Sequence, residues 1–328
     1  MKKTRQPTAL WRHWVVGLAL ANGLVGFAQA AFPEKPIQII IAFPPGGATD
    51  VLARAVGQEI SKQLGQSVIV ENRPGAGGTI GAGAAARSPA DGHTLHIASV
   101  ANMAIVNATY PDQPVSLAAS FDPIGAVAIA PHALVVPASS PAKDVPGLIQ
   151  HLKSTSTLRN YASQGTGSLS HLESALFDLK NNLNLSHIPY KGSAQALPDL
   201  VSGREEMMFD SVVASLPMVS SGKLRYLAVA SGQRTSLLPD VPTLKESGVD
   251  LEANNLFALF APRGTAPAVR QTLETALQAA LASPQLKTTL ASQGVEVYPM
   301  PSAQLAQTVK QEYSDWAEVV KKIGLSPN

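Results

Sequence analysis

The spacing of apolar residues changes period within residues 37–64. Residues 37–43 form a short, β-branched apolar run, which predicts a buried strand. The turn Pro-Pro-Gly-Gly at 44–47 ends that run, because a proline cannot donate to a sheet ladder. From Thr49 to Gly65 the apolar positions recur with helical spacing, so we expect a helix that begins directly after the turn.

This succession of strand, glycine-rich turn and helix recurs along the chain. Asn-Arg-Pro-Gly-Ala-Gly-Gly-Thr at 72–79 follows a second apolar run, and Gln-Gly-Thr-Gly-Ser-Leu-Ser-His at 164–171 follows a later one. Alternating strands and helices predict an α/β fold with parallel-rich sheets, in which ligands bind outside the carboxyl ends of the strands. Further strands are expected over 67–71, 94–98, 158–162, 187–190, 207–209 and 224–230, and further helices over 80–87, 144–153, 172–179 and 193–201.

Two stretches indicate that the chain passes between two lobes. The apolar segment 121–136 is interrupted by Pro131, which a central strand does not accommodate, and 256–260 is an apolar stretch suited to the return. With 328 residues available for two domains, we expect a two-lobe fold with the ligand cleft between the lobes. The expected lobes are 31–129 plus 259–328 and 130–258, and the expected helices after residue 262 are 267–281, 284–293 and 302–323.

The first thirty residues have the pattern of a secretory signal peptide. Four basic residues precede the apolar segment 14–27, which is followed by the small-residue motif Ala28-Gln29-Ala30. The apolar segment is short for a membrane span, so we expect cleavage after Ala30 and a periplasmic location rather than an uncleaved anchor. The sequence contains no cysteine, so a lipid anchor on cysteine is excluded and stability depends on core burial.

Removal of this segment reverses the sign of the net charge. The full chain has 25 Lys and Arg against 23 Asp and Glu, a formal charge of +2. Residues 1–30 hold 4 of the basic residues and no acidic one, so 21 basic and 23 acidic residues remain and the charge becomes −2. No basic cluster is left to bind phosphates, and we therefore expect no nucleic-acid partner.

The glycine turns do not fit a nucleotide site, and the chain lacks the usual catalytic motifs. The turn at 75–79 has no lysine after its last glycine and does not match G-x-G-x-x-G. Neither H-E-x-x-H nor G-x-S-x-G occurs, and Ser168 and His171 are too close in sequence to form a nucleophile elbow with its distant histidine. We expect no cofactor, no metal and no enzymatic activity.

Backbone N–H groups at the glycine turns are the candidate ligand donors. Gly46 and Gly47 lack Cβ and precede a helix N-terminus, a position that suits a carboxylate. Asp50 could itself accept those N–H groups and would then repel an anionic ligand. In the later turn, Ser168 can cap the next helix or donate to a ligand, and Asp210 at a strand end can bind a ligand or cap a helix.

With these residues in view, the chain resembles the Bug family, the extracytoplasmic solute receptors of tripartite tricarboxylate transporters. The resemblance is carried by 36–50 and 70–78, and by the later motifs 165–172, 190–192, 208–210 and 316–320. It implies a two-lobe periplasmic-binding fold of type II character with a small organic acid or amino acid in the cleft. The segment Val-Ala-Asn-Met at 100–103 departs from the family pattern. The ligand-facing residues implied by the resemblance are Phe43, Gly46, Gly47, Thr49, Asp50, Gly77, Gly78, Thr79, Thr166, Ser168, His171 and Asp210.

The resemblance also implies partners. We expect a monomer that takes up a small carboxylate-containing ligand and delivers it to the membrane permease of a tripartite tricarboxylate transporter. One alternative is a sensory receptor that reports to a membrane kinase. Another is a periplasmic enzyme with His171 and Asp210 as its acid–base groups.

Overall fold

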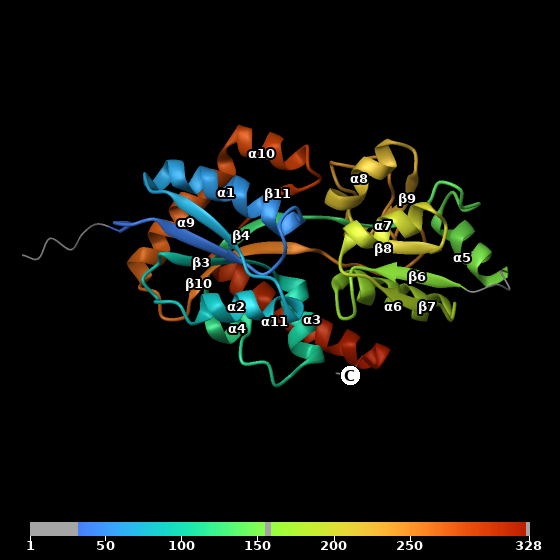
Figure 1. The fold of residues 1–328 in the computed structure, drawn as a ribbon, viewed down its shortest axis with the longest axis horizontal. Coiled ribbons are helices and arrows are strands. Elements are labelled where there is room, and N and C mark those ends of the chain that lie inside the picture. Colours follow the sequence, from blue (N-terminus) through green and yellow to red (C-terminus); the bar gives the residue numbers. More distant parts are fainter. Residues whose placement is uncertain (1–31, 155–158, 326–328) are drawn as a thin grey trace, which may run out of the picture.

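The computed structural model describes residues 32–154 and 159–325 and contains two β-sheets flanked by helices (Figure 1). The α/β two-lobe fold class is therefore as predicted. The predicted signal peptide, residues 1–30, lies outside the described residues. We call the six-stranded sheet with its helices lobe 1 and the five-stranded sheet with its helices lobe 2.

The sheet of lobe 1 has the strand order β11-β4-β10-β3-β1-β2. Strand β1, next to the edge strand β2, pairs in parallel with β2 and β3, whereas β10 runs antiparallel to β3 and β4. The parallel half is the part in which strand, glycine turn and helix succeed each other. The strands are β1 (Ile37–Ile41), β2 (Val68–Asn72), β3 (Thr94–Ser99), β4 (Phe121–Ile129), β10 (Leu256–Pro262) and β11 (Glu296–Pro301).

Helices cover both faces of this sheet. Ile37, Ile39 and Ile41 point to the face that packs against α1, α9 and α10, while Ile40 points to the opposite face, against α2 and the start of α11. Both faces of β1 are thus buried, which explains its continuous apolar sequence. The helical segments are α1 (Ala48–Leu64), η1 (Ala76–Gly78), α2 (Thr79–Ala86), α3 (Val100–Thr109), α4 (Leu117–Ser120), α9 (Pro267–Ala282), α10 (Pro284–Ala291) and α11 (Ser302–Ile323).

The sheet of lobe 2 has the strand order β7-β6-β8-β5-β9, with β6 parallel to β7 and β8, and β5 antiparallel to β8 and β9. Its strands are β5 (His132–Pro137), β6 (Asn160–Ser163), β7 (Ser186–Pro189), β8 (Met207–Ser211) and β9 (Leu224–Val229). Its helices are α5 (Val145–Ser154), α6 (Leu169–Asn181), α7 (Ser193–Val201) and α8 (Val212–Ser220).

The chain passes between the lobes at two adjacent places. Pro131 separates β4 of lobe 1 from β5 of lobe 2, and the N–H of Ala130 donates to the carbonyl of Asn255, just before β10, at 3.1 Å. The lobe boundary that we expected between 258 and 259 falls within β10. Two hydrogen-bonded extended segments therefore connect the lobes at this point.

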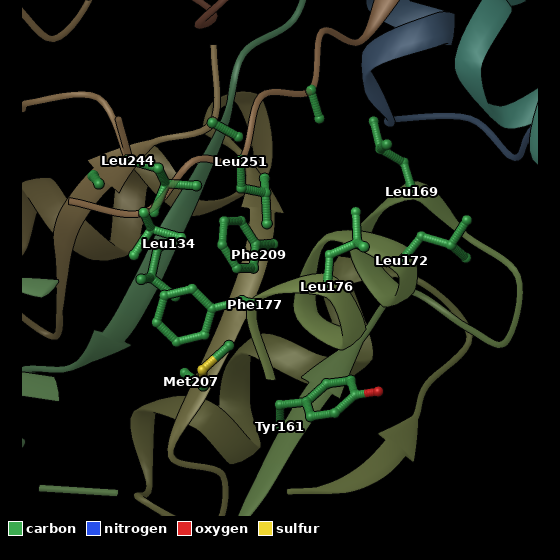
Figure 2. Close-up of a cluster of buried hydrophobic side chains, with 14 of the residues drawn as sticks. Leu134, Tyr161, Leu169, Leu172, Leu176, Phe177, Met207, Phe209, Leu244 and Leu251 are labelled. Atoms are coloured by element: carbon green, nitrogen blue, oxygen red, sulfur yellow. The ribbon is translucent and has the colours of Figure 1, made fainter. Parts of the chain in front are cut away.

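A buried apolar cluster also joins the lobes. It contains Leu172 and Leu176 of α6 in lobe 2, Ile105 of α3 in lobe 1, and Trp316 of α11. Figure 2 shows the lobe 2 part of this cluster, with Phe177 and Phe209 close together; their ring centroids are 5.9 Å apart. The C-terminal helix α11 thus packs against elements of both lobes.

Among the elements that the sequence did not predict, α3 and β11 have a clear physical reason. Helix α3 is buried at most of its positions, so it lacks the polar face that would have revealed a helical period. Strand β11 lies where we expected only helices, and it contains Pro299 and Pro301. It is an edge strand of the sheet, where prolines leave no ladder hydrogen bond unmade.

Candidate functional site

The first glycine turn holds a carboxylate of the chain itself. The N–H of Gly46 donates to Oδ2 of Asp50 at 3.0 Å, and Nε of Arg54 donates to Oδ1 at 3.0 Å. Burial alone would raise the pKa of Asp50, but the hydrogen bonds from Arg54, Gly46 and Asn72 outweigh it and hold the pKa below its usual value. Gly47 is the exposed N-cap of α1 and Thr49 is buried in its first turn. The N–H of Gly46 is thus already satisfied.

The second glycine turn has no such side chain. Gly77 and Gly78 have φ of +64° and +104°, and a Cβ on Gly77 would lie 2.8 Å from Cγ2 of Val106. No side chain caps α2 at Gly78, while the hydroxyl of Thr79 donates to the carbonyl of Ala76 at 2.9 Å. The N–H of Gly78 donates to the carbonyl of Gly75 at 3.0 Å and that of Thr79 to the carbonyl of Ala76, so the start of α2 is closed by its own backbone and carries no side-chain cap.

Hydrogen bonds from residues of both lobes stabilise the turn before α6. Ser168 accepts from the N–H of His171 at 3.2 Å, so it is the N-cap of α6, and it donates to the carbonyl of Gly165 at 2.7 Å. The N–H of Leu169 donates to Oδ1 of Asn102, on α3 of lobe 1, at 3.3 Å. This hydrogen bond connects the lobes directly beside the turn.

His171 stabilises this turn through a hydrogen bond. Its Nδ1 accepts from the N–H of Gly167 at 3.2 Å, and its ring stacks on that of His187 with centroids 3.8 Å apart. Burial, with the neighbouring His187, lowers the pKa of His171 to about 4, and burial lowers the pKa of His187 to about 4. Because its pKa is lowered, His171 is neutral at pH 7. It lines a separate hollow between α6 and the end of α11 and is not among the residues that line the cavity between the lobes.

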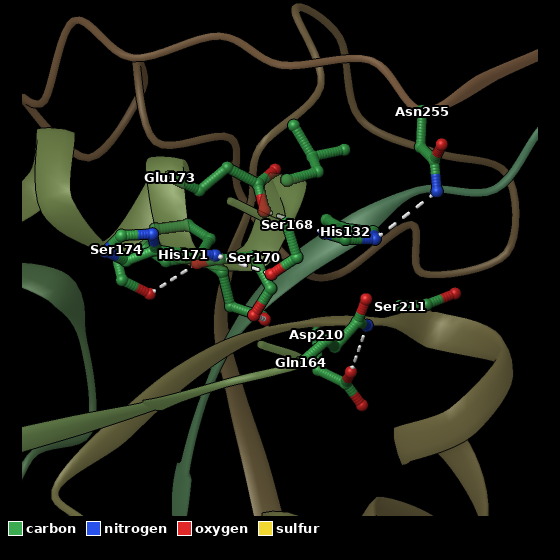
Figure 3. A network of polar contacts seen from close by, with 12 residues as sticks. His132, Gln164, Ser168, Ser170, His171, Glu173, Ser174, Asp210, Ser211 and Asn255 are labelled. Carbon is green, nitrogen blue, oxygen red and sulfur yellow. Dashed lines mark hydrogen bonds and ion pairs between the residues drawn. The ribbon is translucent and has the colours of Figure 1, made fainter. Parts of the chain in front are cut away.

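Asp210 lies inside β8 with no exposed surface. Its Oδ1 accepts from Nε2 of Gln164 at 2.8 Å (Figure 3) and also from Oγ of Ser193 at 2.6 Å. From the sequence we considered Asp210 as a group that binds the ligand or as a helix cap. The structure adds a third arrangement, in which the carboxylate orients the side chain of Gln164.

A cavity of about 490 Å³ lies between the lobes, at the carboxyl ends of β1 and β6. Phe43, Gly77, Thr166 and Ser168 are the predicted residues that line it, whereas Gly46, Gly47, Thr49, Asp50, Gly78, Thr79, His171 and Asp210 do not. The other lining residues are Ala76, Asn102, Val106, Thr109, Tyr110, Gln113, Gln164, Gly165 and Gly167. None of the lining residues is charged, so the cavity offers neutral polar groups and apolar surface.

Sequence reasoning missed the contribution of α3 and of Gln164. Asn102, Val106 and Thr109 come from the helix whose period the sequence did not reveal. Gln164 had a usable signal, because it is a polar residue placed directly after the predicted strand and before the turn glycine.

Metal and membrane features are also absent from the described part of the chain. No group of three or more His, Asp or Glu side chains gathers there in a way that could hold a metal ion. Among residues 32–154 and 159–325, no helix has both the length and the apolar character of a membrane span.

Two α/β lobes that enclose an uncharged cavity between glycine turns define a solute-binding protein of the periplasmic type. Comparison with known proteins identifies the family. The chain belongs to the TctC family, the tripartite tricarboxylate transporter family receptor, whose model matches residues 52–325. Members of this family are solute-binding receptors and not enzymes, as the sequence predicted.

Individual relatives agree along almost the whole chain. BugT of Bordetella pertussis is 35% identical over 94% of this chain and 96% of its own length. The structure of R. palustris Rpa4515 with adipate has a TM-score of 0.83 at 32% identity, covering 90% of this chain and 100% of that one. MatC from Rhodopseudomonas palustris, with bound malate, has a TM-score of 0.79 at 31% identity, covering 88% and 100%. The recognised resemblance to the Bug family is therefore confirmed.

Proposed function

We propose that this chain is the receptor for a small carboxylate-containing solute that it passes to a tripartite tricarboxylate-type permease. The observation that carries the proposal is the uncharged cavity of about 490 Å³ between the lobes. Its volume suits a small organic acid, and two relatives of the same fold hold adipate and malate.

The carboxylate would be held by neutral donors of lobe 1. The first turn of α1 is a poor position, because Asp50 already places a negative charge there. The N-terminus of α2 beside Gly77 has no side-chain cap, and Asn102 and Tyr110 add polar groups to the same cavity. Each hydrogen bond to a carboxylate contributes about 1.5–3 kcal/mol before the entropy cost of binding.

Closure of the lobes would complete the site. The two segments that connect the lobes, at Pro131 and Asn255, are short and extended, so small changes of backbone dihedral angles there can move one lobe against the other. We propose the lobes expected from the sequence, 31–129 plus 259–328 and 130–258, with the second boundary moved to lie between 255 and 256, so that β10 belongs wholly to lobe 1.

A thermal-shift screen of the chain starting at Ala31 tests the receptor function. The screen contains mono-, di- and tricarboxylates, amino acids and aromatic acids, and a ligand that prefers the native state raises the melting temperature. Hits are then titrated calorimetrically. We expect at least one acid to bind with a one-to-one stoichiometry; a flat response across all acids would overturn the proposal.

Export, assembly and delivery need separate measurements. We propose cleavage after Ala30, release into the periplasm as a monomer, and delivery to a permease. Mass spectrometry of the periplasmic protein is expected to show Ala31 at the N-terminus, and light scattering the mass of one chain. Deletion of the gene is expected to abolish uptake of the labelled solute; uptake that persists while a solute-dependent signalling response is lost would favour a sensory receptor.

A further inference from the structure

Lobe 2 contributes the polar side chain of Gln164 to the wall of the cavity. The buried carboxylate of Asp210 holds the amide of this side chain by a hydrogen bond. Nε2 of Gln164 lies 2.8 Å from Oδ1 of Asp210 and 3.1 Å from Oγ of Ser193. Oγ of Ser193 lies 2.6 Å from the same carboxylate oxygen. Figure 3 shows Gln164 and Asp210 side by side, with the hydrogen bond drawn between them. The three groups form a closed triangle at the wall of the cavity.

The donors and acceptors of these three groups determine which end of the Gln164 amide faces Asp210 and Ser193. Oδ1 of Asp210 accepts, and the Ser193 hydroxyl uses its hydrogen to donate to it, so Oγ of Ser193 can only accept from Gln164. The NH2 end of the amide therefore faces both oxygens. A rotation of the amide by half a turn would place its oxygen against two acceptors. The orientation is thus set by Asp210.

This orientation belongs to the ionised carboxylate. Burial raises the pKa of Asp210, although the hydrogen bonds from Ser193 and Gln164 oppose the shift.

The amide oxygen is left for the cavity. Gln164 is half-buried and lines the cavity, and no described residue donates to its Oε1. Two N–H groups of the adjacent turn are engaged, that of Gly165 with Oγ of Ser163 and that of Gly167 with His171, while Thr166 of the same turn also lines the cavity. At Gln164 the lobe 2 wall therefore presents an acceptor oxygen, with the carboxylate of Asp210 behind it.

We propose that the cleft selects carboxylic acids whose other end carries an N–H or O–H donor, such as an ammonium, amide or hydroxyl group, over acids that end in a second carboxylate. The selectivity rests on the proposed function, because it concerns the lobe 2 end of the same cavity. A second carboxylate would place an acceptor oxygen beside the acceptor oxygen of Gln164. An N–H or O–H donor at the same place would form a hydrogen bond with that oxygen.

Calorimetric titration of the chain starting at Ala31 with matched acids tests the selectivity. The diacids are succinate, glutarate and adipate. Their partners of equal length are γ-aminobutyrate, δ-aminovalerate and ε-aminocaproate, and the monoamides of the three diacids. At the length that binds best, we expect the amino or amide acid to bind about tenfold or more tightly than the diacid.

Substitution of the oriented glutamine provides the second arm. Gln164→Met keeps the length of the side chain and removes the acceptor, and we expect the ratio of affinities to fall to within about threefold. Gln150→Met makes the same change at an exposed position of α5 and is expected to keep the wild-type ratio. Circular dichroism and the melting temperature establish that both variants are folded.

The outcomes separate this inference from the proposed function. A diacid that binds as tightly as its amino or amide partner overturns the selectivity and leaves the receptor function in place. Selectivity that persists in Gln164→Met also overturns it, because Gln164 is then not its source. Failure of every acid to bind overturns the receptor function and the selectivity together.

Discussion

Nδ1 of His132 donates to Oε2 of Glu173 across 2.7 Å, and both side chains are buried. His132 begins β5, directly after the connection from lobe 1, and Glu173 lies on α6 of lobe 2. Nε2 of His132 lies 3.4 Å from the amide of Asn255 on the returning connection, and Asn255 accepts from Ser99 of lobe 1 at 2.7 Å. A chain of polar contacts thus runs through the connection between the lobes (Figure 3).

The His132–Glu173 pair makes stability depend on pH. Burial disfavours the charged imidazole, but the charge and hydrogen bond of Glu173, and the charge of Asp210, outweigh burial and raise the pKa of His132. A raised pKa stabilises the fold below the unfolded value, near 6.5, and this stabilisation is lost as the pH rises through the folded value. We expect the free energy of unfolding to fall as the pH rises above about 6.5.

Glu173→Gln removes the charge that raises this pKa. The variant is expected to lose about 1.5–3 kcal/mol at about pH 6 and to show a flatter pH dependence, measured by urea unfolding at each pH. Glu318→Gln, at an exposed position of α11, serves as the control and is expected to follow the wild type. A Glu173→Gln curve parallel to that of the wild type would contradict the assignment.

Gly167→Asn is expected to block the cleft without unfolding the protein. Gly167 has φ of +75°, its position has no atom within 4 Å of an added Cβ, and it lines the cavity. Asparagine accepts this backbone conformation better than other residues, so we expect a stability loss of less than about 1 kcal/mol. Calorimetry with the acid found in the screen should show affinity reduced by about tenfold or more.

Gly222→Asn is the matched control for that substitution. Gly222 has φ of +71° with no atom near an added Cβ, and it lies in the turn between α8 and β9. We expect unchanged affinity in this variant. Equal losses of affinity in both variants would mean that the effect of Gly167→Asn is not local to the cleft.

Trp316 is expected to report closure of the lobes. It is 6% exposed on α11, its Nε1 donates to Glu312 at 2.7 Å, and α11 packs against both α3 and α6. In the chain starting at Ala31 it is the only tryptophan, so intrinsic fluorescence has a single source. We expect its emission to change on titration with a bound acid, with a midpoint equal to the calorimetric one. An unchanged emission at saturation would show that closure leaves the α11 contacts intact.

Tyr313→Phe is expected to destabilise lobe 1. The buried hydroxyl accepts from the N–H of Leu117 at 2.9 Å and donates to Oδ1 of Asn107 at 2.9 Å. Its removal leaves that N–H without its partner, so we expect a loss of about 1–3 kcal/mol in urea unfolding. Tyr298→Phe, at a side chain that is 46% exposed, is expected to change stability by less than about 0.5 kcal/mol. Similar losses in the two variants would contradict the role of the Tyr313 hydroxyl.

The sequence alone determined those elements whose cause is local. The β-branched run of β1, the prolines after it and the spacing of α1 up to Gly65, which has φ of +66°, are properties of adjacent residues. The cap of α6 at Ser168 likewise depends on residues within one turn of the helix. Such features follow from backbone sterics and hydrogen bonds between near neighbours.

Only the tertiary structure decided which groups line the cleft. Asp50 is held by Asn72 and by its own turn, His171 is turned towards His187, and α3 is helical because both lobes and α11 bury it. The amide of Gln164 takes its direction from Asp210, 46 residues further along the chain. The direction of a polar side chain depends on the partners that packing brings to it, and a pattern of neighbouring residues does not contain those partners.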